Sequence, residues 1–344
     1  MRSTIAKFLD RLILKRRKTP LERMFLSGVN LLRPEWLMQR RISLKDFIQK
    51  RRIAIRAPSD DDLDLYRQLQ WGDTWAKYEL TKAFGEMGYP VTEIEPDVVI
   101  HLYGKPTALP ANAHKIVWIY SHPDTVTPDL LRRYDRIFCL SSKYTEKVRR
   151  MGFDAETMYG ATAKTPGVSD IKYDVVFVGN AHADGRRDIV DDALSGLQGK
   201  TKTFEYGLKV WGRDYQYLPE KYWAGEYIDY IKLDRLYRSS LITLNDHTPA
   251  MAAEGFVAVR VFDILASGGF CISDANPGID DIFGDTVPQY RTADELPEMI
   301  RYYIQNPEKR LSLIERGQKI ALSHTWTKRA ERFVGGIDAN FENT

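Results

Sequence analysis

The sequence predicts an α/β protein in which two parallel-sheet domains face a central cleft, preceded by a basic helical extension. Three observations lead to this expectation. Short apolar runs typical of buried strands alternate with amphipathic helices, which is the pattern of parallel sheets covered by helices. The alternation restarts after the linker-like triplet Thr165-Pro166-Gly167. The chain has 344 residues, and single cores seldom grow beyond about 250–300 residues.

Residues 1–50 are expected to form the basic helical extension. Apolar residues such as Ile5, Phe8 and Leu12 recur at helical spacing. The segment holds 13 Lys and Arg against four Asp and Glu, a balance of +9, whereas the rest of the chain holds 37 against 43, a balance of −6. Such a segment suits an anionic membrane surface. A helix packed on the body or an oligomer contact explains it as well. Nucleic acid is disfavoured, because aromatic residues do not interleave with the basic ones.

Residues 51–165 are expected to form the first Rossmann-like domain. Strands are predicted at 53–56, 98–100, 116–119 and 137–140. A turn at 71–73 is expected to precede a helix through 75–84 that Gly88 closes, and a second helix is expected at 144–151.

Residues 166–325 are expected to form the second Rossmann-like domain, and residues 326–344 a tail or helix that returns toward the first. Strands are predicted at 174–178, 204–208, 241–244 and 270–273. Helices are predicted at 187–197, 293–306 and 307–322.

Composition narrows the class of protein. With 43% hydrophobic and 28% charged residues, the chain has an ordinary soluble composition. Cys139 and Cys271 lie in apolar, strand-like runs, so we expect buried thiols in a reducing cytoplasm. No apolar run reaches the ~20 residues that cross a bilayer, and no signal peptide is evident. The six His are scattered without Asp-x-Asp or His-x-x-x-His spacing, which predicts no metal site and no cofactor.

A glycine-containing turn follows the first strand of the second domain. It reads Val178-Gly179-Asn180-Ala181-His182, and Gly185-Arg186-Arg187 comes shortly after. Ligands of open α/β sheets bind at the carboxyl ends of the strands. Asn180 and Arg186 are therefore predicted to bind phosphate, with the next helix N-terminus adding its dipole. A plain surface turn with solvated arginines is the alternative.

The segment 254–269 is the most informative part of the chain. It reads Glu-Gly-Phe-Val-Ala-Val-Arg-Val-Phe-Asp-Ile-Leu-Ala-Ser-Gly-Gly. Its first glycine is expected to open a helix, whose N-terminal N–H groups and dipole can bind an anion. It resembles the signature of the group 1 glycosyltransferases, most closely of the subgroup related to the spore-maturation glycosyltransferases. Short motifs similar to those of that subgroup occur over residues 50–335. They are Trp71-Gly72-Asp73, Ser121-His122-Pro123-Asp124, Val176-Phe177-Val178-Gly179-Asn180, Leu244-Asn245-Asp246-His247 and His324-Thr325-Trp326. The resemblance implies the GT-B arrangement of two Rossmann-like domains.

The resemblance also implies roles for residues of this segment. Glu254 would meet hydroxyls of the donor sugar and Asp263 the ribose, with the amides of Gly255 and Phe256 between them. Arg260 would help to neutralise the diphosphate leaving group. Glu254 and Asp263 are separated by eight residues, whereas the better-known pattern separates two glutamates by seven, and this difference weakens the role of Glu254. An exposed helical ion pair between Arg260 and Asp263 is the alternative.

Two more segments of the second domain are candidates for the cleft. Trp211 and Gly212 resemble the loop that holds the nucleobase in this family, although a structural tryptophan fits almost as well. Asn245 is the last residue of a predicted buried strand and the first residue of the polar run Asn245-Asp246-His247. That polar run is expected either to line the cleft or to cap the next segment.

The resemblance implies that the first domain, residues 51–165, binds the acceptor, and Asp73 and His122 are its catalytic candidates. Asp73 follows the first strand and is either a general base for an acceptor hydroxyl or the N-cap of the next helix. His122 lies in the rigid turn Ser121-His122-Pro123-Asp124, where a lone histidine is more often structural.

These observations predict a metal-independent glycosyltransferase that uses a nucleotide-diphosphate sugar and a glycan or lipid-linked acceptor. The resemblance places it in bacterial surface polysaccharide synthesis, in the cytoplasm or at the inner face of the cytoplasmic membrane. A non-catalytic sugar-nucleotide-binding or glycan-binding subunit that partners a transferase is the alternative, because the second glutamate is missing at its usual spacing.

Overall fold

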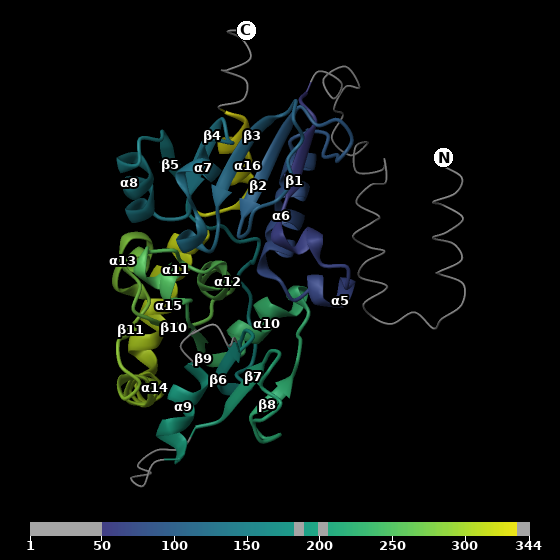
Figure 1. The fold of residues 1–344 in the computed structure, drawn as a ribbon. Coiled ribbons are helices and arrows are strands. Elements are labelled where there is room, and N and C mark those ends of the chain that lie inside the picture. Colours follow the sequence, from purple (N-terminus) through teal and green to yellow (C-terminus); the bar gives the residue numbers. More distant parts are fainter. Residues whose placement is uncertain (1–49, 182–188, 199–205, 336–344) are drawn as a thin grey trace, which may run out of the picture.

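The computed structural model describes residues 50–181, 189–198 and 206–335. They form two α/β bodies stacked one above the other, each with one parallel sheet (Figure 1). The predicted fold class is thereby confirmed. The expected basic extension at 1–50 falls almost entirely outside the described residues. No helix within the described ranges is both long and apolar enough to cross a bilayer.

The first sheet has five parallel strands in sequence order. They are β1 Ile53–Arg56, β2 Val98–Tyr103, β3 His114–Ile119, β4 Arg136–Cys139 and β5 Ala155–Thr157. All six residues of β2 are buried, as expected of a central parallel strand that is covered on both faces. The helices are α5 Leu65–Gln68, α6 Gly72–Glu86, α7 Pro128–Leu131 and α8 Ser142–Arg150, with 3-10 turns at Pro58–Asp61 and Pro123–Thr125.

The second sheet has six parallel strands in the order β11-β10-β9-β6-β7-β8. Their bounds are β6 Tyr173–Val178, β7 Leu208–Trp211, β8 Trp223–Gly225, β9 Ser240–Asn245, β10 Cys271–Asp274 and β11 Gln289–Tyr290. The helices are α9 Ile189–Gln198, α10 Leu233–Arg238, α11 Pro249–Ala253, α12 Val259–Ser267, α13 Pro277–Phe283, α14 Glu295–Gln305 and α15 Pro307–Ala321, with 3-10 turns at Tyr230–Lys232 and Gly284–Thr286. Cys271 on β10 and Cys139 on β4 are both free and buried.

The chain returns to the first domain through α16, Trp326–Val334, which lies beside the first sheet (Figure 1). Thr325 caps this helix by accepting the Lys328 N–H at 3.3 Å. Phe333 is fully buried and makes ring contacts with Phe84, Trp118 and Phe138. The last described helix therefore belongs to the core of the first domain.

Three local predictions need correction. The strand expected at 204–208 is β7 at Leu208–Trp211, because Leu208 and Val210 are the residues that alternate into the core. Gly72 and Asp73 are the first residues of α6 and not a turn before it. The glycine at 255 does not open a helix: α12 begins at Val259, after Ala258 as N-cap.

Candidate active site

The carboxyl ends of β6, β7 and β9 meet at one edge of the second sheet. Gly179 follows β6, and its carbonyl oxygen would lie 1.9 Å from a Cβ added at Gly212, which follows β7. Only glycine at 212 permits this backbone contact. Gly179 N–H donates to the Trp211 carbonyl at 2.9 Å, and Asn180 Oδ1 accepts the Arg213 N–H at 2.9 Å. Asn180, a predicted phosphate ligand, thus holds the two turns together through its amide oxygen.

Arg260 lies at this edge, in the first turn of α12. Its Nη1 is 3.4 Å from Asn245 Oδ1 and 3.7 Å from Asp246 Oδ1, both from the end of β9. The guanidinium carbon lies 5.2 Å from the centre of the Phe177 ring on β6. A Cβ at Gly179 would come within 2.9 Å of Arg260 Nη2. The structure thus brings Gly179, Asn245 and Arg260 together, with the guanidinium where open sheets bind anions.

Asp263, by contrast, is buried against the segment that links the domains. Its Oδ1 accepts a hydrogen bond from Thr162 Oγ1 at 2.6 Å, and its side chain is near the buried Lys164. Burial raises the pKa of Asp263 to about 6, and it lowers the pKa of Lys164 despite the nearby carboxylates. Desolvation therefore outweighs their mutual attraction. A ribose contact by Asp263 requires this packing to open.

The signature residues 254–256 lie at the joint between the domains. The Glu254 carboxylate pairs with Lys147 on α8 of the first domain, and the Glu254 carbonyl accepts Ser141 Oγ–H at 2.6 Å. The amides of Gly255 and Phe256 donate to carbonyls of α11, so in this structure they are not available to a ligand. Phe256 is fully buried and packs edge-on against Tyr144, with ring centres 5.2 Å apart.

The Trp211 ring packs on the neighbouring strand β6. Its ring meets Tyr173 edge-on, with ring centres 5.7 Å apart. The neighbouring Trp223 donates its indole N–H to the Gly212 carbonyl at 3.2 Å. Gly212 and Trp211 therefore lie at the carboxyl edge, but the Trp211 ring is half-buried against the sheet and has a structural contact.

In the first domain, Asp73 is buried at the start of α6. Its Oδ2 accepts the N–H of Ser59, from the turn after β1, at 2.8 Å. Trp71, and not Asp73, is the N-cap residue, so Asp73 ties two segments together and does not cap the helix. Burial raises the pKa of Asp73, the hydrogen bond from Ser59 opposing the change. A carboxylate with a raised pKa is a better proton acceptor.

His122 is at the carboxyl end of β3, near the same turn. It adopts the left-handed conformation, with φ 50°, and its Nδ1 lies 3.0 Å from Ser121 Oγ. A Cβ at Gly104, at the end of β2, would come within 2.6 Å of Ser121 Oγ and 2.9 Å of Pro58. The ends of the first three strands are therefore in close contact, and the imidazole is exposed beside them.

Several buried polar groups of the first domain have no hydrogen-bond partner among the described residues. Two of them lie near the carboxyl edge of the sheet: the indole N–H of Trp71, before α6, and the hydroxyl of Tyr120, after β3. The electrostatic surroundings of Tyr120 include Asp73 and Asp263 from the two domains. Unsatisfied buried polar groups of this kind are commonly completed by water or substrate.

Arg186, the other predicted phosphate ligand, lies outside the described residues. Across the described ranges, no three His, Cys, Asp or Glu side chains are grouped to hold a metal. The metal-independent character of the reaction therefore stays a prediction.

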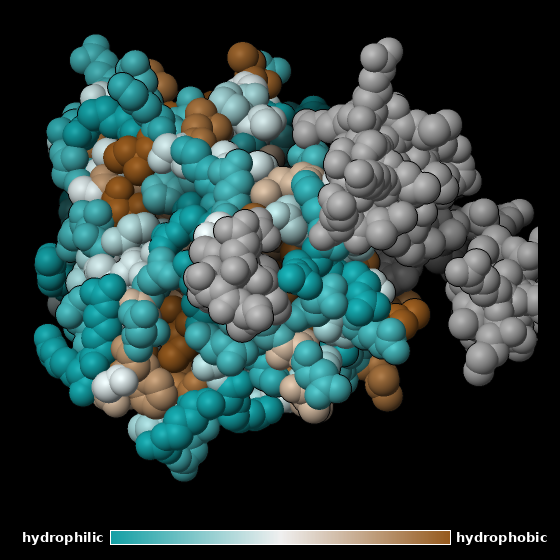
Figure 2. Space-filling view, turned by 90° about the horizontal axis from the view of Figure 1, so that it is seen from above, coloured by the Kyte–Doolittle hydropathy of each residue, from teal (hydrophilic) through white to brown (hydrophobic). Residues whose placement is uncertain are grey.

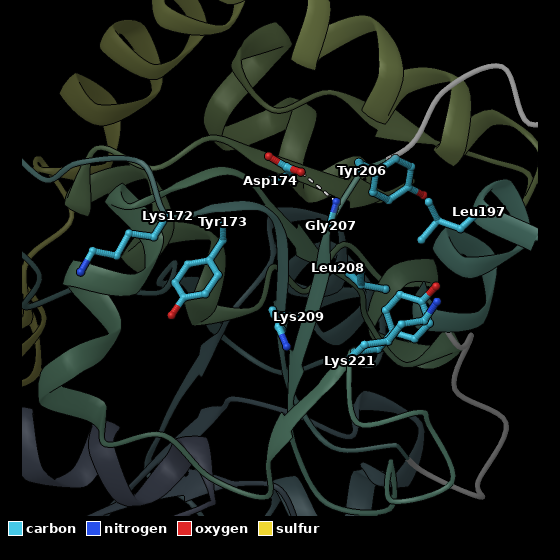
Figure 3. Close-up of a pocket in the computed structure, with 10 residues that line it drawn as sticks. Lys172, Tyr173, Asp174, Leu197, Tyr206, Gly207, Leu208, Lys209 and Lys221 are labelled. Carbon is cyan, nitrogen blue, oxygen red and sulfur yellow. Dashed lines mark hydrogen bonds between the residues drawn. The ribbon is translucent and has the colours of Figure 1, made fainter.

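A hollow of about 400 Å³ lies at the opposite edge of the second sheet (Figure 3). Residues near the amino ends of β6 and β7 line it, among them Lys172, Lys209 and Lys221. The three lysine side chains point in different directions (Figure 3). Because open α/β sheets bind substrates at the carboxyl edge, we do not assign this hollow to the reaction.

Comparison with solved structures places the chain among two-domain glycosyltransferase folds. Sucrose-phosphate synthase of Thermosynechococcus elongatus superposes with a TM-score of 0.63 at 13% identity, covering 86% of this chain and all of that one. A glycosyltransferase of avilamycin A biosynthesis gives a TM-score of 0.56 at 15% identity, over 83% and 96%. T4 phage BGT in complex with UDP-glucose gives 0.52 at 11% identity, over 82% and 98%.

Residues 186–335 match a family model described as "Glycosyl transferase-like". The chain has the GT-B fold, and its residues 186–335 are glycosyltransferase-like. The matched part contains β7, β9, α12 and Arg260, whereas β6, Gly179 and Asn180 precede it. Comparison with curated protein sequences finds no match.

The sequence indicates His247 only as the last residue of the polar run Asn245-Asp246-His247, and it does not indicate Asp274, which directly follows the strand predicted at 270–273. Both residues come directly after the buried runs of β9 and β10, which are neighbouring strands. Polar residues ending two adjacent parallel strands are the signal that could have paired them.

Proposed function

We propose that the enzyme transfers a sugar from a nucleotide-diphosphate donor to a glycan or lipid-linked acceptor in bacterial surface polysaccharide synthesis. Among group 1 glycosyltransferases, the spore-maturation-related subgroup is the one its motifs resemble. One observation carries the proposal: Arg260 sits at the carboxyl edge of the second sheet, within the part that matches the glycosyltransferase-like family model. This is where an open sheet offers a site for a diphosphate.

In the proposed reaction, the bond between the anomeric carbon and the diphosphate oxygen breaks, and the acceptor oxygen bonds to that carbon. Negative charge builds up on the departing diphosphate. Arg260 and Arg186 would stabilise this charge through paired N–H donors, with the N-terminus of α12 adding its dipole. These groups need no metal, and full activity in excess EDTA is the expected result.

The acceptor side is the carboxyl edge of the first sheet. The acceptor hydroxyl loses a proton as its oxygen attacks, and Asp73 is our candidate for the base because it is buried and its pKa is raised. His122 is the second candidate, since it lies exposed at the end of β3. A base at Asp73 favours inversion at the anomeric carbon, whereas the resembled subgroup leans toward retention.

Three further donor contacts are part of the proposal. Trp211 and Gly212 would hold the nucleobase, Asp263 the ribose and Glu254 the sugar. In each case an existing contact must change first, because Trp211 packs on Tyr173, Asp263 on Thr162 and Glu254 on Lys147. Relative movement of the two domains on donor binding is the change that would release Glu254.

A panel of nucleotide sugars in thermal-shift assays tests the donor proposal directly. A specific ligand at 100 times its dissociation constant should stabilise the fold by about 2.7 kcal/mol. The stabilising nucleotide sugar should then be hydrolysed slowly without acceptor and transferred rapidly with one. If a nucleotide sugar binds but is neither hydrolysed nor transferred, the non-catalytic alternative replaces this proposal.

We place the enzyme at the inner face of the cytoplasmic membrane through residues 1–50. The face seen from above in Figure 2 is mostly hydrophilic with separate apolar spots, so among the described residues it offers no broad apolar surface to a bilayer. Near an anionic surface each Lys or Arg contributes about 1 kcal/mol. The whole chain should sediment with anionic liposomes in low salt, and a variant lacking residues 1–48 should not. Failure of the whole chain to sediment points instead to a protein contact.

A further inference from the structure

His247 has both ring nitrogens engaged at the end of β9. Its Nε2 accepts the N–H of Ala258 at 3.0 Å, so this nitrogen carries no proton. The ring proton is therefore on Nδ1, which donates to Asp274 Oδ1 at 2.6 Å. The imidazole is fully buried. One neutral tautomer in one orientation is thus specified by its two partners.

Asp274, at the end of the neighbouring strand β10, fixes that orientation. Its Oδ2 accepts the backbone N–H of His247 at 3.1 Å, and its Oδ1 also accepts Ser273 Oγ–H at 3.0 Å. The carboxylate therefore holds the histidine at both its ring and its backbone. The arrangement resembles the pairing in which a carboxylate sets the tautomer and direction of a working imidazole.

Ala258 is the residue from which α12 starts. It is the N-cap, with φ −60° and ψ 137°, and its methyl side chain cannot cap a helix. His247 tethers this residue from the neighbouring strand by accepting its N–H. Arg260 follows two positions later, and its guanidinium contacts Asn245 and Asp246 on the same strand end. Residues at the end of β9 therefore contact both the backbone at the start of α12 and the side chain of Arg260, which together form the proposed diphosphate site.

We propose that His247, oriented by Asp274, is a positioning residue for the donor diphosphate. It fixes the start of α12, and through it the position of Arg260 and of the helix dipole. This inference rests on the proposed donor site at the same edge. Binding and catalysis at charged groups lose strength when a supporting contact no longer holds the group in place. Removing the acceptor on His247 should therefore weaken binding of the diphosphate and leave binding of the nucleoside part unchanged.

Two substitutions test the donor nitrogen and the acceptor nitrogen of the imidazole separately. In His247→Asn the amide nitrogen lies near the place of Nδ1 and keeps the donor toward Asp274, but the acceptor for Ala258 is lost. In His247→Gln the amide oxygen reaches the place of Nε2 and keeps that acceptor. We expect His247→Asn to lower nucleoside diphosphate affinity at least about tenfold and His247→Gln to lower it less than about threefold. His101→Asn is the control, since His101 is a buried histidine of the first domain.

Titration calorimetry with UDP, GDP and ADP, and with the nucleoside of whichever binds, is the measurement. A loss confined to the diphosphate and to His247→Asn supports the inference. Equal losses in both variants, parallel losses for nucleoside and diphosphate, or wild-type affinity in His247→Asn overturn it. If His247→Asn does not fold, Asp274→Asn takes its place: it should also weaken the diphosphate selectively, and wild-type affinity there overturns the inference. A wild-type protein that binds none of the three diphosphates instead refutes the proposed donor site.

Discussion

Replacing Arg260 by lysine tests the electrostatic part of the proposed mechanism. Lysine keeps a positive charge near Asp246 but loses the planar fork that binds two phosphate oxygens at once. One hydrogen bond to a charged group contributes about 1.5–3 kcal/mol. Losing one bond of the pair in the transition state should thus lower kcat/KM about 10- to 150-fold. Unfolding free energy should change by less than about 1 kcal/mol, because the charge beside Asp246 is retained.

The assay is steady-state transfer with the donor found in the thermal-shift screen, beside unfolding of each variant in urea. Arg238→Lys on α10 is the matched control. Arg238 pairs with Asp234 at 2.9 Å, and its side chain is 17% exposed against 19% for Arg260. Arg238→Lys should keep the wild-type kcat/KM. If the two lysine variants have the same kcat/KM, Arg260 only stabilises the fold and the reasoning is refuted.

Three further predictions follow from the same contacts. Gly212→Ala should unfold several degrees below the wild-type protein, because its Cβ would lie 1.9 Å from the Gly179 carbonyl oxygen. Gly72→Ala is the control and should keep the wild-type melting temperature, because no atom lies within 4 Å of its Cβ. Equal melting temperatures of the two variants would contradict this prediction. Asp263 has a pKa raised to about 6 in the folded state against about 3.9 when unfolded, so the fold loses up to about 3 kcal/mol of stability as pH rises from 4 to 6. Asp263→Asn should lack this dependence in urea titrations at each pH, and an unchanged pH profile would show that Asp263 is not the cause. Asp73→Asn should lower kcat at least about 100-fold with donor KM unchanged, and a wild-type kcat would leave Asp73 only its bond to Ser59.

The sheets could be predicted from the sequence because buried parallel strands are nearly continuous apolar runs. The runs at 98–100 and 174–178 lie within β2 and β6. β7 was misplaced because its lysine at 209 breaks the run, while only Leu208 and Val210 face the core. Short edge strands such as β8, with one buried face or none, leave little apolar signal.

The candidate site could be predicted only in part, and the reason is tertiary contact. The signature predicts a diphosphate contact for Arg260, and the structure places this residue at the carboxyl edge of the second sheet beside Asn245 and Asp246. The diphosphate contact itself stays a prediction. The partners of Glu254 and Asp263 are Lys147 and Thr162, each about 100 residues away, and no local pattern indicates them. The pairing of His247 with Asp274 could not be predicted for the same reason, because it depends on β9 and β10 lying side by side.

The most direct test of the proposed donor site is a crystal structure of the enzyme with its preferred nucleoside diphosphate bound. We expect the diphosphate at the carboxyl edge of the second sheet, in contact with the Arg260 guanidinium and close to the turn at Gly179. A diphosphate bound elsewhere, for example in the lysine-lined hollow at the opposite edge of that sheet, would contradict it.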